Sequence, residues 1–199
     1  KLMKEMLSEF FPLEYIAVIE GEAETTQKLV QSNFDYVFFT GSTKVGQSVM
    51  QTASETLTPV TLELGGKSPT IVAEDADLDL AVQDALSGIF TANGEACIAS
   101  SRLLLHEKIY DDFVEQFVSI ANKIKLGDAL DHDTELGPLV SSKQLSLVQN
   151  HVQTAVEDGI GFLTSNQAPN TGGFFQAPLL LADDSGKSRI SKSEVFGPV

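Results

Sequence analysis

The only cysteine of the sequence, Cys97, stands in the segment NGEACIASSR. A free cysteine is most often a small buried hydrophobic residue without a chemical role. Here Asn93, Gly94 and Glu95 are turn formers that interrupt the helical pattern before them, so Cys97 is expected in a loop or at the start of a new helix. A thiolate is stabilised in such a position and can act as a nucleophile. The sequence therefore offers a candidate nucleophile, with an inert buried thiol as the alternative.

A candidate general base, Glu63, ends the apolar stretch PVTLEL and is followed closely by Gly65 and Gly66. The apolar residues of this stretch alternate, so they fall on one face of a predicted strand and Glu63 falls on the other, at its carboxyl end. Ligands bind at that end of strands in open α/β sheets. A carboxylate there could be partly desolvated, which would raise its pKa toward that of a useful base. The alternative is an ordinary surface glutamate.

The segment FTGSTKVG joins a β-rich stretch to a helical pattern through two glycines, Gly41 and Gly46. It is not a P-loop, because Gln47 follows Gly46 where that pattern needs a lysine. A glycine-rich strand-to-helix turn presents free backbone N–H groups and the positive end of a helix dipole, so it could hold a phosphate, with Ser42 adding a hydroxyl. Gly46 would also let a ligand or a neighbouring strand approach closely. The alternative is plain turn chemistry.

The charge of the chain restricts its partners. Its 199 residues include 13 Lys plus Arg and 28 Asp plus Glu, which gives a formal net charge of −15. Such a surface repels nucleic acid and anionic lipid headgroups, so we expect neither nucleic acid nor a membrane as a partner. Apolar runs such as PLLLA at 178–182 are far shorter than the roughly 20 residues of a membrane-spanning helix. We expect a globular protein.

The cysteine and histidine content restricts the compartment and the metal chemistry. A single cysteine cannot form a disulfide within the chain, which fits a reducing compartment, and we expect a cytoplasmic protein. It also excludes a metal site built on a cysteine cluster. His106, His132 and His151 show no spacing typical of metal ligands, so no metal site is predicted.

The elements that must position these residues alternate along the chain. Helices are expected over 1–9, 22–32, 44–55, 78–92, 107–124 and 141–159. Strands are expected over 15–20, 35–40, 59–64, 69–73 and 101–106, with shorter candidates at 160–164 and 178–182. This alternation predicts an α/β protein with a doubly wound parallel sheet and helices on both faces. The segment ELGGKSP at 63–69 interrupts the pattern, as a hinge between lobes or as a plain turn.

Four segments together resemble the aldehyde dehydrogenase superfamily. They are FTGSTKVG, LELGGKSP, NGEACIASSR and EVFGPV, and they occur in the order and at the separations of that family over essentially the whole chain. The resemblance implies an aldehyde dehydrogenase-like fold with a Rossmann-like cofactor lobe and a catalytic lobe. Residues 1–65 would be the later part of the dinucleotide-binding domain, and residues 66–199 most of the catalytic domain. It also implies a homo-oligomer in the full-length protein.

The resemblance implies a role for each motif residue. Cys97 would be the nucleophile and Glu63 the general base of an enzyme that oxidises a small-molecule aldehyde to a carboxylic acid with NAD or NADP. The thiolate would attack the carbonyl to give a thiohemiacetal, hydride loss would give a thioester, and water deprotonated by Glu63 would cleave it. The residues expected to contact the cofactor are Gly41, Ser42, Thr43, Lys44, Val45, Gly46, Leu64, Glu194 and Phe196.

The chain departs from the family pattern in two ways. Glu95 stands where the family usually has Gln, so an added negative charge near Cys97 is expected to raise the pKa of the thiol. The upstream asparagine of the family's oxyanion hole and its lysine-bearing ribose segment have no counterpart, so we expect an internal portion of the family chain, inactive when isolated. A non-catalytic α/β dinucleotide-binding or interaction module that keeps the motifs is the alternative. A cysteine hydrolase is disfavoured because no motif places a histidine beside Cys97.

Overall fold

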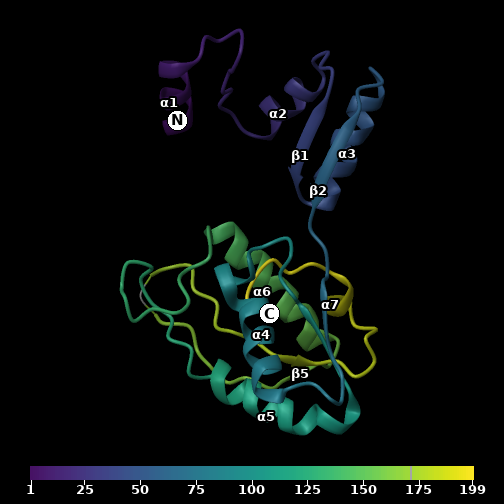
Figure 1. The fold of residues 1–199 in the computed structure, drawn as a ribbon, viewed down its shortest axis with the longest axis vertical. Helices are drawn as coiled ribbons and strands as arrows, with labels where there is room; N and C mark the ends of the chain where they lie inside the picture. The colour runs from purple at the N-terminus through teal and green to yellow at the C-terminus, as the bar shows by residue number, and fades with distance from the viewer. Residues whose placement is uncertain (171) are drawn as a thin grey trace. The chain divides into compact units, whose positions relative to one another are not determined.

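The first part of the chain is built around a strand–helix–strand segment from residue 37 to residue 64. The computed structural model describes residues 1–170 and 172–199 and divides the chain into two units, Lys1–Leu64 (unit 1) and Gly65–Val199 (unit 2) (Figure 1). Unit 1 contains α1 (Leu2–Phe10), α2 (Ala23–Val30), β1 (Val37–Gly41), α3 (Thr43–Ser54) and β2 (Val60–Leu64). The cofactor and catalytic roles expected of residues 1–65 and 66–199 remain predictions.

In unit 1, α3 connects two parallel strands in a βαβ arrangement. β1 and β2 pair in register, so that Thr40 lies beside Glu63 and Gly41 beside Leu64. The core is formed by Val30 of α2 and by two residues of α3, against the inner faces of β1 and β2. Burial of one face of α3 and of alternate strand residues follows from the helix and strand periods of the sequence.

The strand predicted at residues 15–20 is wrong. This segment has no regular secondary structure, and Tyr15, Ile16 and Ile19 are exposed. Its composition suits a strand, but no strand of the described residues pairs with it, and an extended segment needs such a partner to satisfy its N–H and C=O groups. The helix expected at 1–9 is present as α1, although none of its side chains is buried.

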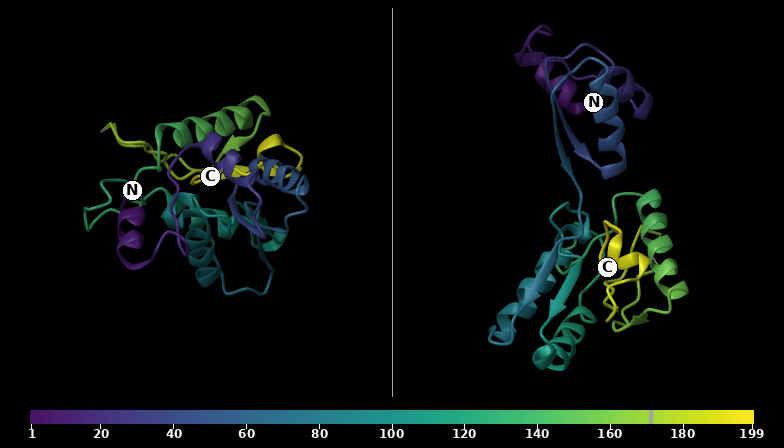
Figure 2. Two further views of the ribbon diagram at one scale, coloured as in Figure 1. Left: turned by 90° about the horizontal axis from the view of Figure 1, so that it is seen from above. Right: turned by 90° about the vertical axis from the view of Figure 1, so that its right-hand side faces the viewer.

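Unit 2 has a second parallel strand pair and a separate helical part. Its elements are β3 (Pro69–Val72), α4 (Leu78–Phe90), β4 (Arg102–Leu105), α5 (Tyr110–Ala121), α6 (Ser142–Glu157), β5 (Gly161–Phe162), β6 (Leu181–Ala182) and α7 (Arg189–Lys192), with 3-10 helices at Thr91–Gly94 and Glu107–Ile109. β3 and β4 pair in parallel and are connected by α4. In the right-hand view of Figure 2 these teal elements stand apart from the green and yellow α6 and α7.

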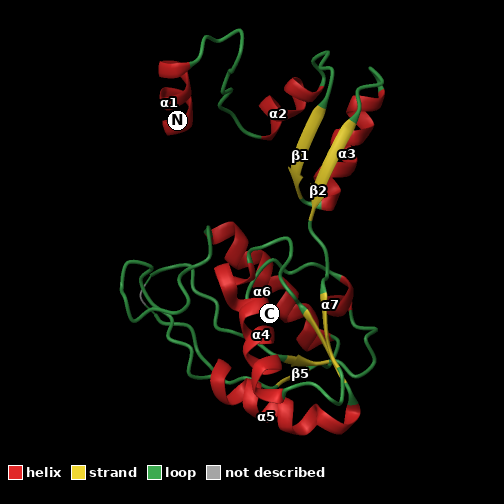
Figure 3. Ribbon diagram, viewed as in Figure 1, coloured by secondary structure: helices red, strands yellow, loops and turns green. Residues whose placement is uncertain are grey.

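Each part of unit 2 has its own apolar core. The larger core joins α4 and α5 to the inner faces of β3 and β4, with Phe113 and Val82 fully buried. The smaller core joins α6 to Ile190 of α7 and to Val195. Loops, green in Figure 3, connect α5 to α6 and run between β5 and β6. The α/β class with parallel strand pairs is therefore confirmed.

The two last strands differ from the prediction. The candidates at 160–164 and 178–182 shorten to two-residue strands, which pair with each other in an antiparallel fashion. Thr164 limits the pairing, because its hydroxyl accepts the N–H of Leu180 at 3.0 Å and donates to the carbonyl of Pro178 at 3.1 Å. A side-chain hydroxyl thus takes the place of ladder hydrogen bonds.

Capping side chains begin three of the helices that carry or support the motifs. The side chains of Ser42, Asp77 and Ser141 accept backbone N–H groups at the starts of α3, α4 and α6. Such caps satisfy donors that have no partner within the helix.

Gly46 allows α3 to pack closely on β2. A Cβ atom at this buried position would lie 2.7 Å from Cδ2 of Leu64. The close approach of a neighbouring strand, expected from the sequence, is therefore present. Gly46 is therefore required for packing within unit 1.

We predict that Gly46→Val lowers the free energy of opening of the β1–β2 pair by about 1–3 kcal/mol, because the added carbons overlap Leu64. Hydrogen exchange of the β1 and β2 amides measures this opening in unit 1 itself. Adding Leu64→Ala to Gly46→Val should restore part of the loss. Gln47→Val, at the exposed neighbouring position, is the control. Equal protection in the Gly46 and Gln47 variants would contradict the close contact.

Candidate active site

In unit 1 the carboxyl ends of β1 and β2 bring two of the predicted site segments together. The register places Glu63 and Leu64 directly beside the last residues of β1, and the chain turns from Gly41 into α3. Ser42 is the N-cap of α3 and accepts the N–H of Val45 at 3.4 Å. This edge therefore joins the predicted base to the predicted cofactor turn within unit 1.

The start of α3 has the properties of an anion site. The turn residues 42–45 are exposed, and the first turn of α3 carries no acidic residue. The helix dipole and the N–H groups of the first turn favour a negative group at this place. The exposed N–H groups and the absence of acidic residues in this turn suit the binding of a dinucleotide phosphate.

Glu63 is exposed, so the burial that we expected to desolvate its carboxylate is not found in this chain. The reason is its position in β2, where Val60 and Leu62 face the core and the Glu63 side chain lies on the open face. On that face the hydroxyls of Tyr36 and Thr61 form a hydrogen bond. The role of Glu63 as a base remains a prediction.

In unit 2 the nucleophile motif begins with an unusual backbone. After α4 the chain enters a 3-10 turn in which Ala92 and Asn93 have positive φ angles of 52° and 59°. The Asn93 side chain donates to the carbonyl of Pro138 at 2.9 Å, which holds the turn in place. Left-handed residues of this kind persist where the surroundings fix them, and they concentrate at functional sites.

Cys97 lies in a turn and is exposed, as a loop position requires. The turn is closed by a hydrogen bond from the Ala99 N–H to the Ala96 carbonyl at 3.0 Å. The Ser100 N–H donates to the Gly88 carbonyl of α4 at 2.9 Å, which fixes the chain just beyond the thiol. The loop placement predicted for Cys97 is therefore present, with the thiol accessible to a small molecule.

Glu95 has a structural partner. Both of its carboxylate oxygens accept the N–H of Val140 at 3.2 Å. With Asn93, it attaches the nucleophile loop to the segment 138–140. Sequence reasoning missed this contact because residues 138–140 carry no motif. The charge that stands in place of the family's usual Gln is engaged by a backbone donor.

The last motif, EVFGPV, meets the other two motifs of unit 2. The Gly66 N–H donates to Oε1 of Glu194 at 3.3 Å. Gly94, with φ +69°, lies so close to Gly197 that a Cβ atom on it would be 2.2 Å from the Gly197 carbonyl oxygen. A small gap of about 10 Å³ remains among these segments, also lined by Phe196. Residues far apart in the sequence are thus brought to one place.

Phe196 is held in a strained conformation. Its φ angle is 55°, and its side chain is 37% exposed. Gln144 of α6 supports this backbone, because its Nε2 donates to the Phe196 carbonyl at 2.7 Å. A positive φ is uncommon for a residue with a bulky side chain. Gln144 is a supporting residue that no motif in the sequence indicates.

Lys67, in the GGK motif, lies half-buried beside these segments. Burial lowers its pKa to about 8; the positive charge of Arg102 adds to the lowering, and the negative charge of Glu194 opposes it. Nε of Arg102 donates to the Lys67 carbonyl at 2.6 Å. Burial also lowers the pKa of His151, and the charge of Lys67 lowers it further. The partly desolvated Lys67 therefore lies near Arg102 and His151 at the GGK turn.

Asp183 organises the chain that leads to Glu194. Its carboxylate accepts the hydroxyls of Ser185, Ser188 and Ser191 and the N–H groups of residues 185, 186 and 188. The Ser188 hydroxyl, followed by those of Ser191 and Ser185, holds the pKa of the Asp183 carboxyl well below its usual range. The segment DDSGKS therefore forms a turn with Asp183 at its centre.

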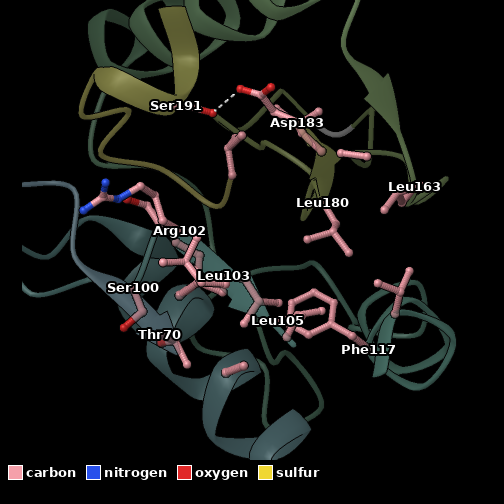
Figure 4. Close-up of a pocket in the computed structure, with 18 of the residues that line it drawn as sticks. Thr70, Ser100, Arg102, Leu103, Leu105, Phe117, Leu163, Leu180, Asp183 and Ser191 are labelled. Carbon is pink, nitrogen blue, oxygen red and sulfur yellow. Dashed lines mark hydrogen bonds between the residues drawn. The ribbon is translucent and has the colours of Figure 1, made fainter. Parts of the chain in front are cut away.

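A large cavity of unit 2, about 960 Å³, lies elsewhere (Figure 4). It is bounded by β4, with Leu103 and Leu105, and by the segment that carries Leu180 and Asp183. Neither Cys97 nor the residues of EVFGPV other than Val199 line it. The small gap is instead lined by Gly66, Ala96 and Glu194 of the three motif segments, and Cys97 follows Ala96 in the chain, so we place the candidate site of unit 2 at these segments.

Every helix within residues 1–170 and 172–199 is too short or too polar to cross a membrane. In the same residues no three or more His, Cys, Asp or Glu side chains gather as metal ligands would.

Comparison with known proteins identifies the family. Residues 1–199 match the model of the aldehyde dehydrogenase family. The chain belongs to this family, and the resemblance carried by the four motifs is confirmed.

Individual relatives agree with this assignment. An aldehyde dehydrogenase of Emericella nidulans is 40% identical over 202 aligned positions, which cover 100% of this chain and 40% of the relative. Succinate-semialdehyde dehydrogenase (NADP(+)) GabD of Escherichia coli (strain K12) is 35% identical over 190 residues, 94% of this chain and 39% of the relative. The crystal structure of betaine aldehyde dehydrogenase from Staphylococcus aureus in complex with NAD+ matches with a TM-score of 0.92 and 33% identity, over 98% of this chain and 40% of that one. The chain thus spans about two fifths of the length of these relatives.

We predict that Asp183→Asn lowers the thermal midpoint of the chain by several degrees at neutral pH, because an amide cannot accept all the donors around it. The pKa of Asp183 is depressed on folding, so its stabilisation is complete above the pKa of an unfolded aspartate, about 3.9, and is lost as the pH falls below that value toward the folded-state pKa. The difference between parent and variant should shrink in this acid range. Melting followed by circular dichroism from pH 7 to pH 3 measures it.

The control is Asp184→Asn, at the exposed neighbouring position. It should leave the midpoint nearly unchanged. A difference between Asp183→Asn and the parent that stays constant down to pH 3 would argue against a stabilising ionised carboxylate.

Proposed function

We propose that this protein takes part in the NAD(P)-dependent oxidation of an aldehyde to a carboxylic acid, with Cys97 as the nucleophile and Glu63 as the general base. The observation that carries the proposal is the convergence of three motifs in unit 2, where Glu194 contacts Gly66 and Gly94 contacts Gly197. Family membership supports the same reaction.

Cys97 can perform the first step because its thiol is accessible in a fixed turn. In the proposed mechanism its thiolate attacks the aldehyde carbon and forms a thiohemiacetal, and its own backbone N–H donates to the developing oxyanion. Loss of hydride from this adduct leaves a thioester on Cys97. Sulfur suits both stages, since it is a strong nucleophile and a better leaving group than an alkoxide.

Glu63 would release the product. Its carboxylate, at the carboxyl end of β2, would deprotonate the water that attacks the thioester, and the carboxylic acid would leave. The exposure of Glu63 gives water free access to it.

The cofactor residues are proposed on chemical fit. The bound nicotinamide would supply the hydride acceptor for the reaction. The turn Gly41, Ser42, Thr43, Lys44, Val45, Gly46 would hold the pyrophosphate, since the start of α3 is exposed and free of acidic residues. Leu64 would contact the nicotinamide through its carbonyl, and Glu194 and Phe196 would hold the ribose and the ring.

The choice of cofactor and aldehyde stays open between the relatives. The name of one relative gives NADP(+) and succinate semialdehyde, whereas a solved structure has NAD+ and is a betaine aldehyde dehydrogenase. We therefore propose NAD or NADP as the cofactor and an aldehyde as the substrate. As the sequence resemblance implies, we also propose a cofactor role for residues 1–65, a catalytic role for residues 66–199 and a homo-oligomer of the whole protein. From the single cysteine we propose a cytoplasmic location.

We predict that Cys97→Ala, in a protein of full family length that contains this sequence, lowers the rate of aldehyde oxidation by on the order of a thousandfold or more. Dinucleotide binding should stay nearly intact, because the thiol is absent from the proposed cofactor contacts. NADH absorbance and calorimetric titration measure the two effects. Leu130→Ala, at a position 90% exposed, is the control.

Thiol trapping separates the catalyst from a non-catalytic module that keeps the motifs. A catalytic Cys97 should react with iodoacetamide much faster than a model thiol at the same pH. A variant Cys97→Ala that still forms acid at a substantial fraction of the parent rate would refute the nucleophile assignment.

We predict that Glu63→Gln lets the acyl-enzyme form but slows its hydrolysis, because an amide cannot accept the proton of water. The adduct should accumulate on Cys97 and appear in the intact mass after mixing with aldehyde and cofactor. Glu55→Gln, an exposed glutamate of the same unit, is the control and should show no accumulation. Slow turnover of Glu63→Gln with no adduct on Cys97 would count against the base role.

A further inference from the structure

The Glu194 carboxylate rests on the glycine pair of the GGK motif. A Cβ atom built on Gly65 would lie 2.0 and 2.1 Å from the two carboxylate oxygens and 2.3 Å from the carboxylate carbon. The carboxylate therefore occupies the place where any other residue would carry its side chain. In the same arrangement the Gly66 N–H donates to Oε1 at 3.3 Å.

The two glycines differ in what surrounds them. A Cβ atom on Gly66 would meet no heavy atom within 4 Å. Neither glycine has a positive φ angle, so a left-handed backbone is not the reason for either one. At Gly65 the absence of a side chain makes room for Glu194, whereas Gly66 contributes its N–H.

Basic side chains lie beside the glycine pair and Glu194. Lys67 follows the glycine pair directly, Arg102 of β4 donates to the Lys67 carbonyl, and His151 of α6 lies near Lys67. The negative charge of Glu194 and the ammonium of Lys67 stabilise each other. A carboxylate with a backbone donor and a neighbouring cation has fewer accessible orientations than a free surface glutamate.

We propose that Gly65 and Gly66 position the Glu194 carboxylate in one orientation, with Oε1 bound by the Gly66 N–H and Oε2 accepting a hydroxyl group of the ligand. This inference rests on the proposed function, in which Glu194 meets the cofactor ribose. Gly65 is then a positioning residue for dinucleotide binding, although it touches no ligand itself. Holding the carboxylate in advance reduces the ordering cost of binding.

The substitution Gly65→Ala tests the proposal with little risk to the fold. Its methyl group overlaps only the far end of a flexible side chain, so the carboxylate can swing away while the backbone stays in place. Gly66→Ala is the matched control, because its methyl group enters open space and the N–H is kept. Each variant adds one methyl group, and the two substituted positions are adjacent.

The first measurement needs no activity. In the NMR spectrum of the chain, the amide proton of residue 66 should shift as Glu194 titrates with acid, and Glu194→Gln should abolish that titration. Gly65→Ala should abolish it too, whereas Gly66→Ala should retain it. An amide at position 66 that titrates equally in the parent, Gly65→Ala and Glu194→Gln would overturn the positioning of Glu194 by the glycine pair.

The second measurement uses a protein of full family length. Gly65→Ala should raise the KM for the dinucleotide by about tenfold, as Glu194→Gln does, with a smaller effect on kcat. The double variant should be no worse than either single variant. A normal KM in Gly65→Ala, with the residue-66 titration lost, would overturn its role in binding. If the parent protein oxidises no aldehyde, the proposed function fails, and the amide titration still decides whether the glycine pair holds Glu194.

Discussion

The contact of backbone with backbone at Gly94 and Gly197 is the constraint on which the motif region of unit 2 depends. A Cβ atom on Gly94 would lie 2.2 Å from a carbonyl oxygen, and backbone cannot move aside as a flexible side chain can. Only a glycine in a left-handed conformation meets this demand. Gly94 stands at the beginning of the nucleophile motif, so its contact with Gly197 joins that motif to EVFGPV. The contact fixes the position of Phe196 and Glu194 relative to the Cys97 turn. The neighbouring hydrogen bonds of Asn93, Glu95 and Gln144 then hold both segments from outside.

Elements with local signals could be predicted from the sequence. The strand–glycine turn–helix at β1 and α3, the capped helix α4 and the amphipathic α5 and α6 follow from residue periods and capping residues, which act within a few positions. The loop at Cys97 follows from the turn formers before it. Motif order located the candidate site, because those residues are few in type and specific in spacing.

Pairings between distant residues could not be predicted in the same way. Glu194 and Gly66 are 128 positions apart, and nothing in either segment indicates that an N–H of one meets a carboxylate of the other. Sequence reasoning missed the contact of Glu95 for a similar reason, since its partner Val140 lies in a segment without a motif. The strand predicted at 15–20 failed because strand propensity says nothing about the presence of a partner edge. The short length of the antiparallel β5–β6 pair could not be predicted either, because beyond it the Thr164 hydroxyl replaces ladder hydrogen bonds.

The large cavity beside β4 and the small gap of unit 2 differ in their linings. Leucines line the large cavity together with Lys67, Arg102 and Asp183, whereas Cys97 and Glu194 do not line it. Around the small gap, glycine backbones approach so closely that little empty volume remains. A site assembled from backbone donors and one thiol needs precise distances more than space, since each N–H must reach its acceptor within about 3 Å. Close packing supplies that precision, because glycines at 65 and 94 remove the side chains that would separate the three motifs. The large cavity is therefore a place where unit 2 is incompletely filled, whereas the close backbone contacts of Gly65 and Gly94 lie where the motifs meet.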